Sequence, residues 1–145
     1  MRFFGRKDEI AELHNIRNLS LNTARFTIVT GRRRSGKTSL LLKAYEDVDD
    51  LLYFFVARKS EEELCKDFVN EIKEKLQIPI LGEVSRFADI FKYLLQLSKT
   101  RPLTIIIDEF QDFKRVNASV FSDMQKIWDL NKQDAHVNLV VCGSI

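Results

Sequence analysis

The stretch FTIVTGRRRSGKTSL, residues 26–40, decides the fold of this 145-residue chain. It opens with five apolar or β-branched residues, Phe26 to Thr30, which predict a short strand. Residues 31–38 then match the pattern G-x-x-x-x-G-K-[ST] without a mismatch, and apolar residues at helical spacing predict a helix from Thr38 to about Asp47. A loop between a strand and the positive end of a helix presents consecutive backbone N–H groups to an anion. The stretch therefore predicts a phosphate-binding loop.

The side chains of this loop have separate expected roles. Lys37 should reach the β- and γ-phosphates of a bound nucleotide, and the Thr38 hydroxyl should ligate Mg²⁺. The three consecutive arginines leave two interpretations open: solvent-facing residues that raise the local potential, or direct contacts to a phosphate or a partner surface. The residues expected to line the nucleotide are Gly31, Arg32, Arg33, Arg34, Ser35, Gly36, Lys37, Thr38 and Ser39.

Outside the loop, apolar runs alternate with amphipathic segments. Strands are expected over residues 51–56, 103–110 and 137–142, and helices over 8–19, 60–77, from 85 to the break at 101–102, and over 117–132. The second of these helices opens with a capping box formed by Ser60 and Glu63. Continuous apolar strands are typical of a parallel sheet that is covered on both faces. The chain is therefore expected to form a three-layer α/β/α fold with a mainly parallel sheet.

Two acidic residues end the apolar run LTIIIDEFQD, residues 103–112. Asp108 falls at the carboxyl end of a strand, where open α/β sheets bind ligands, and it can hold Mg²⁺ through the water shell of the ion. Glu109 can polarise the water that attacks a γ-phosphate, which is the task of a general base. The alternative is that both acids simply end a strand in solvent. Ser144, just past the last strand, is expected either to sense the γ-phosphate or to belong to a plain turn.

Composition and charge narrow the class of protein. The net charge of +2 divides unevenly, because residues 1–45 carry ten Lys or Arg against three Asp or Glu. A basic N-terminal part suits an anionic ligand such as a nucleotide. The longest apolar run is too short to span a bilayer, and the N-terminus lacks the apolar core of a secretory signal. Cys65 and Cys142 have no disulfide or metal spacing, so a cytoplasmic protein that does not enter a membrane is expected.

Taken in order, the segments FFGRKDEIAEL, GRRRSGKTSLL, IIIDEFQ and VVCGSI resemble the AAA+-related prokaryotic ATPases often called the archaeal ATPase family. These belong to the additional-strand, catalytic-glutamate class of P-loop NTPases. The resemblance implies an ATPase that uses ATP and Mg²⁺, with residues 31–38 as Walker A and with Asp108 and Glu109 as Walker B. It also implies that Ser144 occupies the sensor-1 position, and that Phe4, Gly5 and Arg6 form an N-terminal box beside the adenine.

The resemblance further implies how the strands are ordered. It places the strand 137–142 between the Walker A and Walker B strands and the strand 51–56 at one edge of the sheet. Members of the family usually continue into a fifth strand, a helical lid and a C-terminal domain. Residues 1–145 are therefore expected to be the nucleotide-binding core of a larger ATPase, with the strand 26–30 left as a sheet edge and with any protein or nucleic-acid partner bound through later parts.

Three other functions are compatible with a phosphate-binding loop. A nucleotide-gated binding or scaffold module would hold ATP or ADP with little turnover, and only a hydrolysis measurement separates it from an ATPase. A P-loop kinase would need a phosphoryl-acceptor site, for which the sequence has no signal. A helicase would need a track of aromatic and basic residues for nucleic acid, which is also missing.

Overall fold

The computed structural model describes residues 6–31, 36–80 and 82–144, apart from the side chains of residues 6 and 144. Eleven elements of secondary structure follow one another along these residues. In chain order they are α1 (Arg6–Ser20), β1 (Arg25–Gly31), α2 (Lys37–Ala44), β2 (Leu51–Phe55), α3 (Glu61–Leu76), α4 (Phe87–Leu97), β3 (Leu103–Asp108), the 3-10 helix η2 (Phe110–Asp112), α5 (Phe113–Val116), α6 (Val120–Asn131) and β4 (Val137–Ser144).

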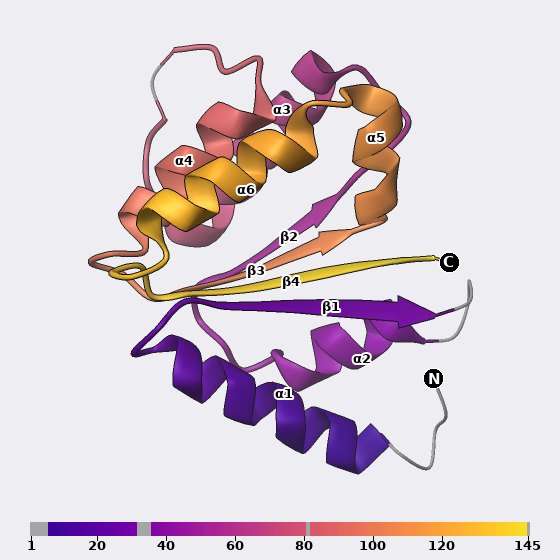
Figure 1. The fold of residues 1–145 in the computed structure, drawn as a ribbon, viewed down its shortest axis with the longest axis vertical. Helices are drawn as coiled ribbons and strands as arrows, with labels where there is room; N and C mark the ends of the chain where they lie inside the picture. Colours follow the sequence, from indigo (N-terminus) through magenta and orange to yellow (C-terminus); the bar gives the residue numbers. More distant parts are fainter. Residues whose placement is uncertain (1–5, 32–35, 81, 145) are drawn as a thin grey trace.

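The four strands form one parallel sheet in the order β1-β4-β3-β2. Helices α1 and α2 cover one face of the sheet, and α3, α4 and α6 lie over the other face (Figure 1). All four carboxyl ends point to the same edge of the molecule, where the chain leaves β1 for α2 and β3 for η2. The three-layer α/β fold predicted from the sequence is thus confirmed, together with the central place of β4 and the edge place of β2.

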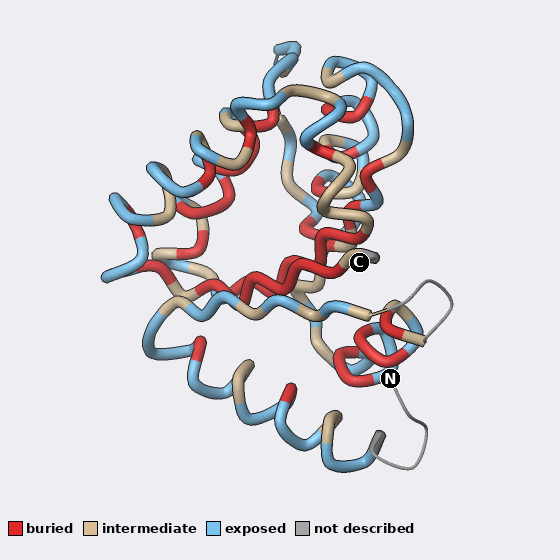
Figure 2. The backbone as a smooth tube through the Cα atoms, turned by 45° about the vertical axis from the view of Figure 1, so that its right-hand side comes forward, coloured by how far each residue is buried: buried red, intermediate tan, exposed pale blue. Residues whose placement is uncertain are grey.

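Alternating residues of the strands enter two separate cores. Ile105, Ile107 and Leu139 pack against the layer of α3, α4 and α6, whereas Ile106 and Val140 pack against α1 and α2. The larger core holds a cluster of phenylalanine rings in contact with one another: Phe54, Phe68, Phe87, Phe91 and Phe113. Figure 2 shows the central strands buried along most of their length and α1 largely exposed. The hydrophobic effect of these two cores fixes the sheet between its helical layers.

The start of α3 was predicted correctly from its capping box. The Ser60 hydroxyl accepts a hydrogen bond from the Glu63 N–H at 3.2 Å, and the Glu63 carboxylate accepts one from the Ser60 N–H at 3.4 Å. Two of the N–H groups that a helix leaves without intrahelical partners are satisfied in this way. Three glutamates in the first turn add a favourable interaction with the helix dipole.

Several predicted boundaries are wrong, and the structure gives a physical reason for two of the differences. Helix α2 ends at Ala44 rather than near residue 47, because Tyr45 leaves the helical conformation and buries its ring, with its hydroxyl donating to the Leu13 carbonyl at 3.1 Å. Strand β3 ends at Asp108 rather than at residue 110, because Glu109 adopts a left-handed conformation with φ of 56°. The segments η2 and α5 follow, so the helix expected over 117–132 covers only 120–131.

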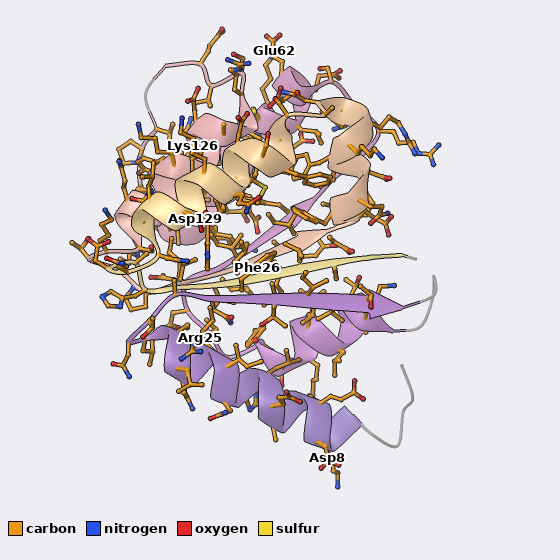
Figure 3. All side chains as sticks on the ribbon, in the orientation of Figure 1. Asp8, Arg25, Phe26, Glu62, Lys126 and Asp129 are labelled. Carbon is orange, nitrogen blue, oxygen red and sulfur yellow. The ribbon has the colours of Figure 1, made fainter. Side chains whose placement is uncertain are left out.

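The two edge strands are less covered than the central pair. On β2, Leu52 and Phe54 are buried on one face, whereas on the other face Leu51 and Tyr53 are partly buried and Phe55 is 49% exposed, so this strand is fully buried on one face only. On β1, Phe26 and Ile28 are 48% and 63% exposed, although the Phe26 ring contacts Trp128 of α6 with centroids 5.8 Å apart. Figure 3 shows Phe26 on the side of the sheet that faces α6. Among the described residues, no strand pairs with the outer edge of β1, as was expected from the resemblance.

Candidate functional site

The candidate site lies at the carboxyl ends of the parallel strands, on the face covered by α2. Asp108 ends β3, and its register partner on β4 is Cys142. Tyr53 comes from β2, and Thr38 from the first turn of α2. Side chains alternate between the two faces along a strand, so residues two apart share a face. Asp108, Cys142 and Tyr53 each lie two residues after a side chain that contacts the core of α1 and α2, namely Ile106, Val140 and Leu51. All three therefore lie on the face covered by these helices.

The carboxylate of Asp108 is the centre of this arrangement. It is only 5% exposed, and both of its oxygens accept hydrogen bonds. The Oδ2 atom accepts from the Thr38 hydroxyl at 2.8 Å and from the Tyr53 hydroxyl at 2.5 Å. The Oδ1 atom accepts from the Glu109 N–H at 2.9 Å and from the Cys142 thiol at 3.1 Å. Four donors therefore hold one buried carboxylate in a single orientation.

These contacts shift the proton affinities of the groups. Burial opposes the charge of Asp108, but the hydrogen bonds outweigh it and hold the pKa of this carboxyl below its usual value. Burial and then the Asp108 carboxylate raise the pKa of the Cys142 thiol to about 12, while the positive charge of Lys37 opposes that rise. Burial and the same carboxylate also raise the pKa of Tyr53. At neutral pH, Asp108 is therefore charged, whereas the Tyr53 hydroxyl and the Cys142 thiol keep the protons that they donate to it.

The N-terminus of α2 carries neither a capping side chain nor an acidic residue. Gly36 caps it in a left-handed conformation with φ of 86°, which favours glycine, and it brings no side chain to satisfy the N–H groups of the first turn. No acidic residue stands in that turn, in contrast to the three glutamates at the start of α3. Lys37 is the first residue of the helix and is buried at 6% exposure. A buried cation at the positive end of a helix creates strong local attraction for a phosphate.

Glu109 directly follows Asp108 in the chain, but its backbone is left-handed rather than extended. Its left-handed backbone turns the chain out of the sheet and directs its own N–H back to Asp108. Its carboxylate accepts a hydrogen bond from the Gln111 amide, with Nε2 and Oε2 2.7 Å apart. A left-handed conformation is uncommon for a residue other than glycine, and such positions cluster at functional sites.

Most of the predicted site residues that the structure describes lie together. Lys37, Thr38, Asp108 and Glu109 meet at one edge of the sheet, and the backbone of Ser144 pairs with Gly31 at the start of the loop. Ser39 is exposed on α2. Gly5, residues 32–35 and the side chains of Arg6 and Ser144 lie outside the described residues, so the roles predicted for them, including those of the three arginines, stay predictions.

Sequence reasoning missed three side chains of the site. Tyr53 and Cys142 both fall in segments predicted to be strands, and nothing in either segment singles out a partner for Asp108. Gln111 was noted only as part of the segment IIIDEFQ. Its position two residues after Glu109 could have suggested a contact between the two side chains. Their hydrogen bond, however, depends on the left-handed turn at Glu109.

The pair of Thr38 and Asp108 has the chemistry that a magnesium ion requires. Magnesium prefers hard oxygen ligands and is commonly held in nucleotide sites by one or two protein groups together with phosphates and waters. A hydroxyl and a charged carboxylate 2.8 Å apart fit that requirement. In the described part of the chain, no group of three or more His, Cys, Asp or Glu side chains is placed to hold a metal, so the ion would depend on this pair together with phosphates and waters.

A family model described as an ATPase domain predominantly from Archaea matches residues 3–145. The chain is 30% identical over 142 residues to MJECL04, an uncharacterised protein of Methanocaldococcus jannaschii, and this match covers 98% of the chain and 29% of that protein. It is 43% identical over 56 residues to MJ0424 of the same organism, a match that covers 39% of the chain and 54% of that protein. The chain thus spans less than two thirds of the length of either relative.

Two solved structures have a similar fold. The Walker-type ATPase PABY2304 of Pyrococcus abyssi superposes with a TM-score of 0.65 at 19% identity, covering 91% of this chain and 44% of that one. Cdc6p of Pyrobaculum aerophilum superposes with a TM-score of 0.64 at 18% identity, covering 99% and 40%. Both comparisons support the α/β architecture found here. No helix among the described residues is both long and apolar enough to cross a bilayer.

Proposed function

We propose that this protein, which belongs to the family of ATPase domains predominantly from Archaea, binds ATP with Mg²⁺ and hydrolyses it to ADP and phosphate. Residues 1–145 supply the nucleotide-binding core in this proposal, and the activity drives parts of a larger protein that lie beyond it. We expect the protein to act in the cytoplasm.

One contact carries the proposal: the hydrogen bond of 2.8 Å between the Thr38 hydroxyl and the Asp108 carboxylate. These residues stand 70 positions apart in the chain. Each belongs to a separate sequence motif, and each motif by itself predicts a magnesium ligand. Their meeting at the carboxyl edge of a parallel sheet supports a common ion for both.

The proposed roles of the binding residues follow from charge and geometry. Backbone N–H groups from Gly31 to Thr38 would cradle the phosphates, and Lys37 would offset their negative charge. Thr38 and Asp108 would hold the metal, which when bound neutralises charge on the β- and γ-phosphate oxygens. Because four hydrogen bonds already fix the carboxylate, little reorganisation of Asp108 would be needed on binding.

Glu109 is the proposed general base. A water molecule would attack the γ-phosphorus while its proton passes to the Glu109 carboxylate. The bond between the γ-phosphorus and the bridging oxygen of ADP would break, and that oxygen would leave as part of ADP. The proton taken by Glu109 would return to solvent after phosphate is released.

The first test of this function is nucleotide binding by Lys37→Ala. We expect titration calorimetry with MgATP to detect binding to the wild type and none to the variant, because Lys37 is the buried cation at the N-terminus of α2. The control is Lys43→Ala, which removes an exposed lysine from the last turn of the same helix. Equal affinity of wild type and Lys37→Ala for MgATP would exclude the phosphate-loop assignment.

The second test is hydrolysis by Glu109→Gln. The amide keeps the shape of the side chain but cannot accept a proton, so we expect MgATP binding to persist while phosphate release falls by at least about a hundredfold. Equal release by wild type and variant would remove Glu109 from the mechanism. Binding of MgATP by the wild type without any release would instead favour a nucleotide-gated binding module.

A further inference from the structure

The amide of Gln111 lies between the proposed general base and the end of β4. Its Nε2 atom donates to Glu109 Oε2 at 2.7 Å. Its Oε1 atom is buried, and no donor among the described residues reaches it. The neighbour of Oε1 is the backbone of Gly143, where an added Cβ atom would lie 2.0 Å from it. The amide therefore occupies the space that the missing side chain of residue 143 leaves.

Electrostatics sets the orientation of this amide. If the amide were turned over, its oxygen would face the Glu109 carboxylate, and two acceptors would repel each other. The donor must therefore face Glu109, and the acceptor must face the backbone of Gly143. Leaving a buried acceptor without a partner costs about 1–3 kcal/mol. An apolar side chain of similar length would fill the same space without that cost, so packing alone does not explain a glutamine here.

A second unfavourable feature stands two residues away. Glu109 has a left-handed backbone, which costs of order 1–3 kcal/mol for a residue other than glycine. That turn is what brings the Glu109 carboxylate and the Gln111 amide to the same side of η2. Locally unfavourable features, such as an unpartnered buried acceptor or a left-handed backbone, are expected where a residue serves function rather than folding. Both features concern the placement of one carboxylate.

We propose that Gln111 is the positioning residue for the Glu109 carboxylate, and that Gly143 makes this possible by leaving room for the amide. The inference rests on the proposed function, because it assigns Gln111 a role only if Glu109 acts as a base. The site then needs three residues in fixed relation: the base, the amide that orients it, and a glycine directly before Ser144. A loose carboxylate would spend less time in the orientation that accepts a proton from water.

Gly143→Ala is a suitable variant for testing this inference. Gly143 is in a strand and its φ lies outside the left-handed region, so its backbone accepts alanine without strain. The atom that the new methyl group would meet is the far end of a flexible side chain. We therefore expect the protein to fold, with the Gln111 amide displaced from Glu109.

The experiment compares wild type, Gln111→Ala, Gly143→Ala and the double variant. Phosphate release is measured in single turnovers with protein in excess over MgATP, which resolves slow hydrolysis. We expect each single variant to lower the rate of hydrolysis by about tenfold or more at unchanged MgATP affinity. The double variant should be no slower than Gln111→Ala, since the amide that the new methyl group displaces is already gone. Gln96→Ala, which removes an exposed glutamine of α4, is the control.

A second measurement does not depend on turnover. In ¹H–¹⁵N spectra, the side-chain amide signals of Gln111 are those missing from Gln111→Ala. We expect these signals to shift in Gly143→Ala, because the hydrogen bond to Glu109 is lost. Unshifted signals would overturn the contact on which the inference depends.

The outcomes separate the inference from the proposed function. Hydrolysis by the wild type together with unchanged hydrolysis in Gln111→Ala overturns the positioning role and leaves the ATPase assignment standing. A further loss when Gly143→Ala is added to Gln111→Ala shows that residue 143 acts directly on the site, which also overturns the proposal. No hydrolysis by the wild type overturns both.

Discussion

The hydrogen bond from Tyr53 to Asp108 offers a quantitative test of the site. The substitution Tyr53→Phe removes one hydroxyl and keeps the ring. A hydrogen bond to a charged group contributes about 1.5–3 kcal/mol to stability. Because Tyr53 is only half-buried, water can replace part of the lost interaction, and we expect a loss of about 1–2 kcal/mol in the free energy of unfolding. For a domain of this size, that loss corresponds to a drop of about 2–8 °C in Tm.

The pH dependence of this effect has a definite sign. Asp108 has a folded-state pKa below its unfolded value, so its contacts contribute stability that is present above the unfolded pKa and is lost as the pH falls through the folded pKa. Tyr53→Phe removes one of these contacts. The difference in stability between wild type and variant should therefore be full near neutral pH and should shrink below a pH of about 4, the ordinary pKa of aspartate.

The assay is urea denaturation followed by circular dichroism, repeated from neutral pH into the acid range. Tyr93→Phe is the matched control, because Tyr93 is an exposed tyrosine of α4, and surface substitutions usually change stability by less than about 0.5 kcal/mol. Equal midpoints for wild type and Tyr53→Phe at neutral pH would refute the reasoning. A difference of the same size in acid would show that the hydroxyl acts through something other than the charged carboxylate.

Three further predictions concern separate parts of the chain. Asp108→Asn should raise the Mg²⁺ concentration that phosphate release requires, since a neutral amide holds the ion poorly; identical magnesium titrations of variant and wild type would contradict this. Ser60→Ala should lower the stability by about 1 kcal/mol through the lost cap of α3, which a shift of about 2–4 °C in the melting curve would record. Arg32→Ala and Arg33→Ala should each change nucleotide affinity by under about 1 kcal/mol, more at low salt than at high salt; a roughly tenfold loss at physiological salt would show that one of these arginines is a direct ligand.

Local patterns in the chain predict the class of fold and the residues expected to carry the chemistry. Continuous apolar strands alternate with amphipathic helices, and this periodicity depends only on local spacing. The loop around Lys37 and Thr38 and the acids at 108 and 109 could be recognised because each motif is contiguous. The capping box of Ser60 and Glu63 was predictable for the same reason, since both partners lie within one turn.

The surroundings of the two acids depend on contacts between distant parts of the chain. The partners of Asp108 come from β2, β4 and α2, and strand register brings them together through pairings between residues far apart in the chain. Likewise, the left-handed turn at Glu109 is not encoded by a glycine, so local rules predicted a strand there. The space for Gln111 depends on Gly143, a glycine of β4 that comes much later in the chain. Side-chain positions of this kind follow from packing across the sheet, which no local pattern specifies.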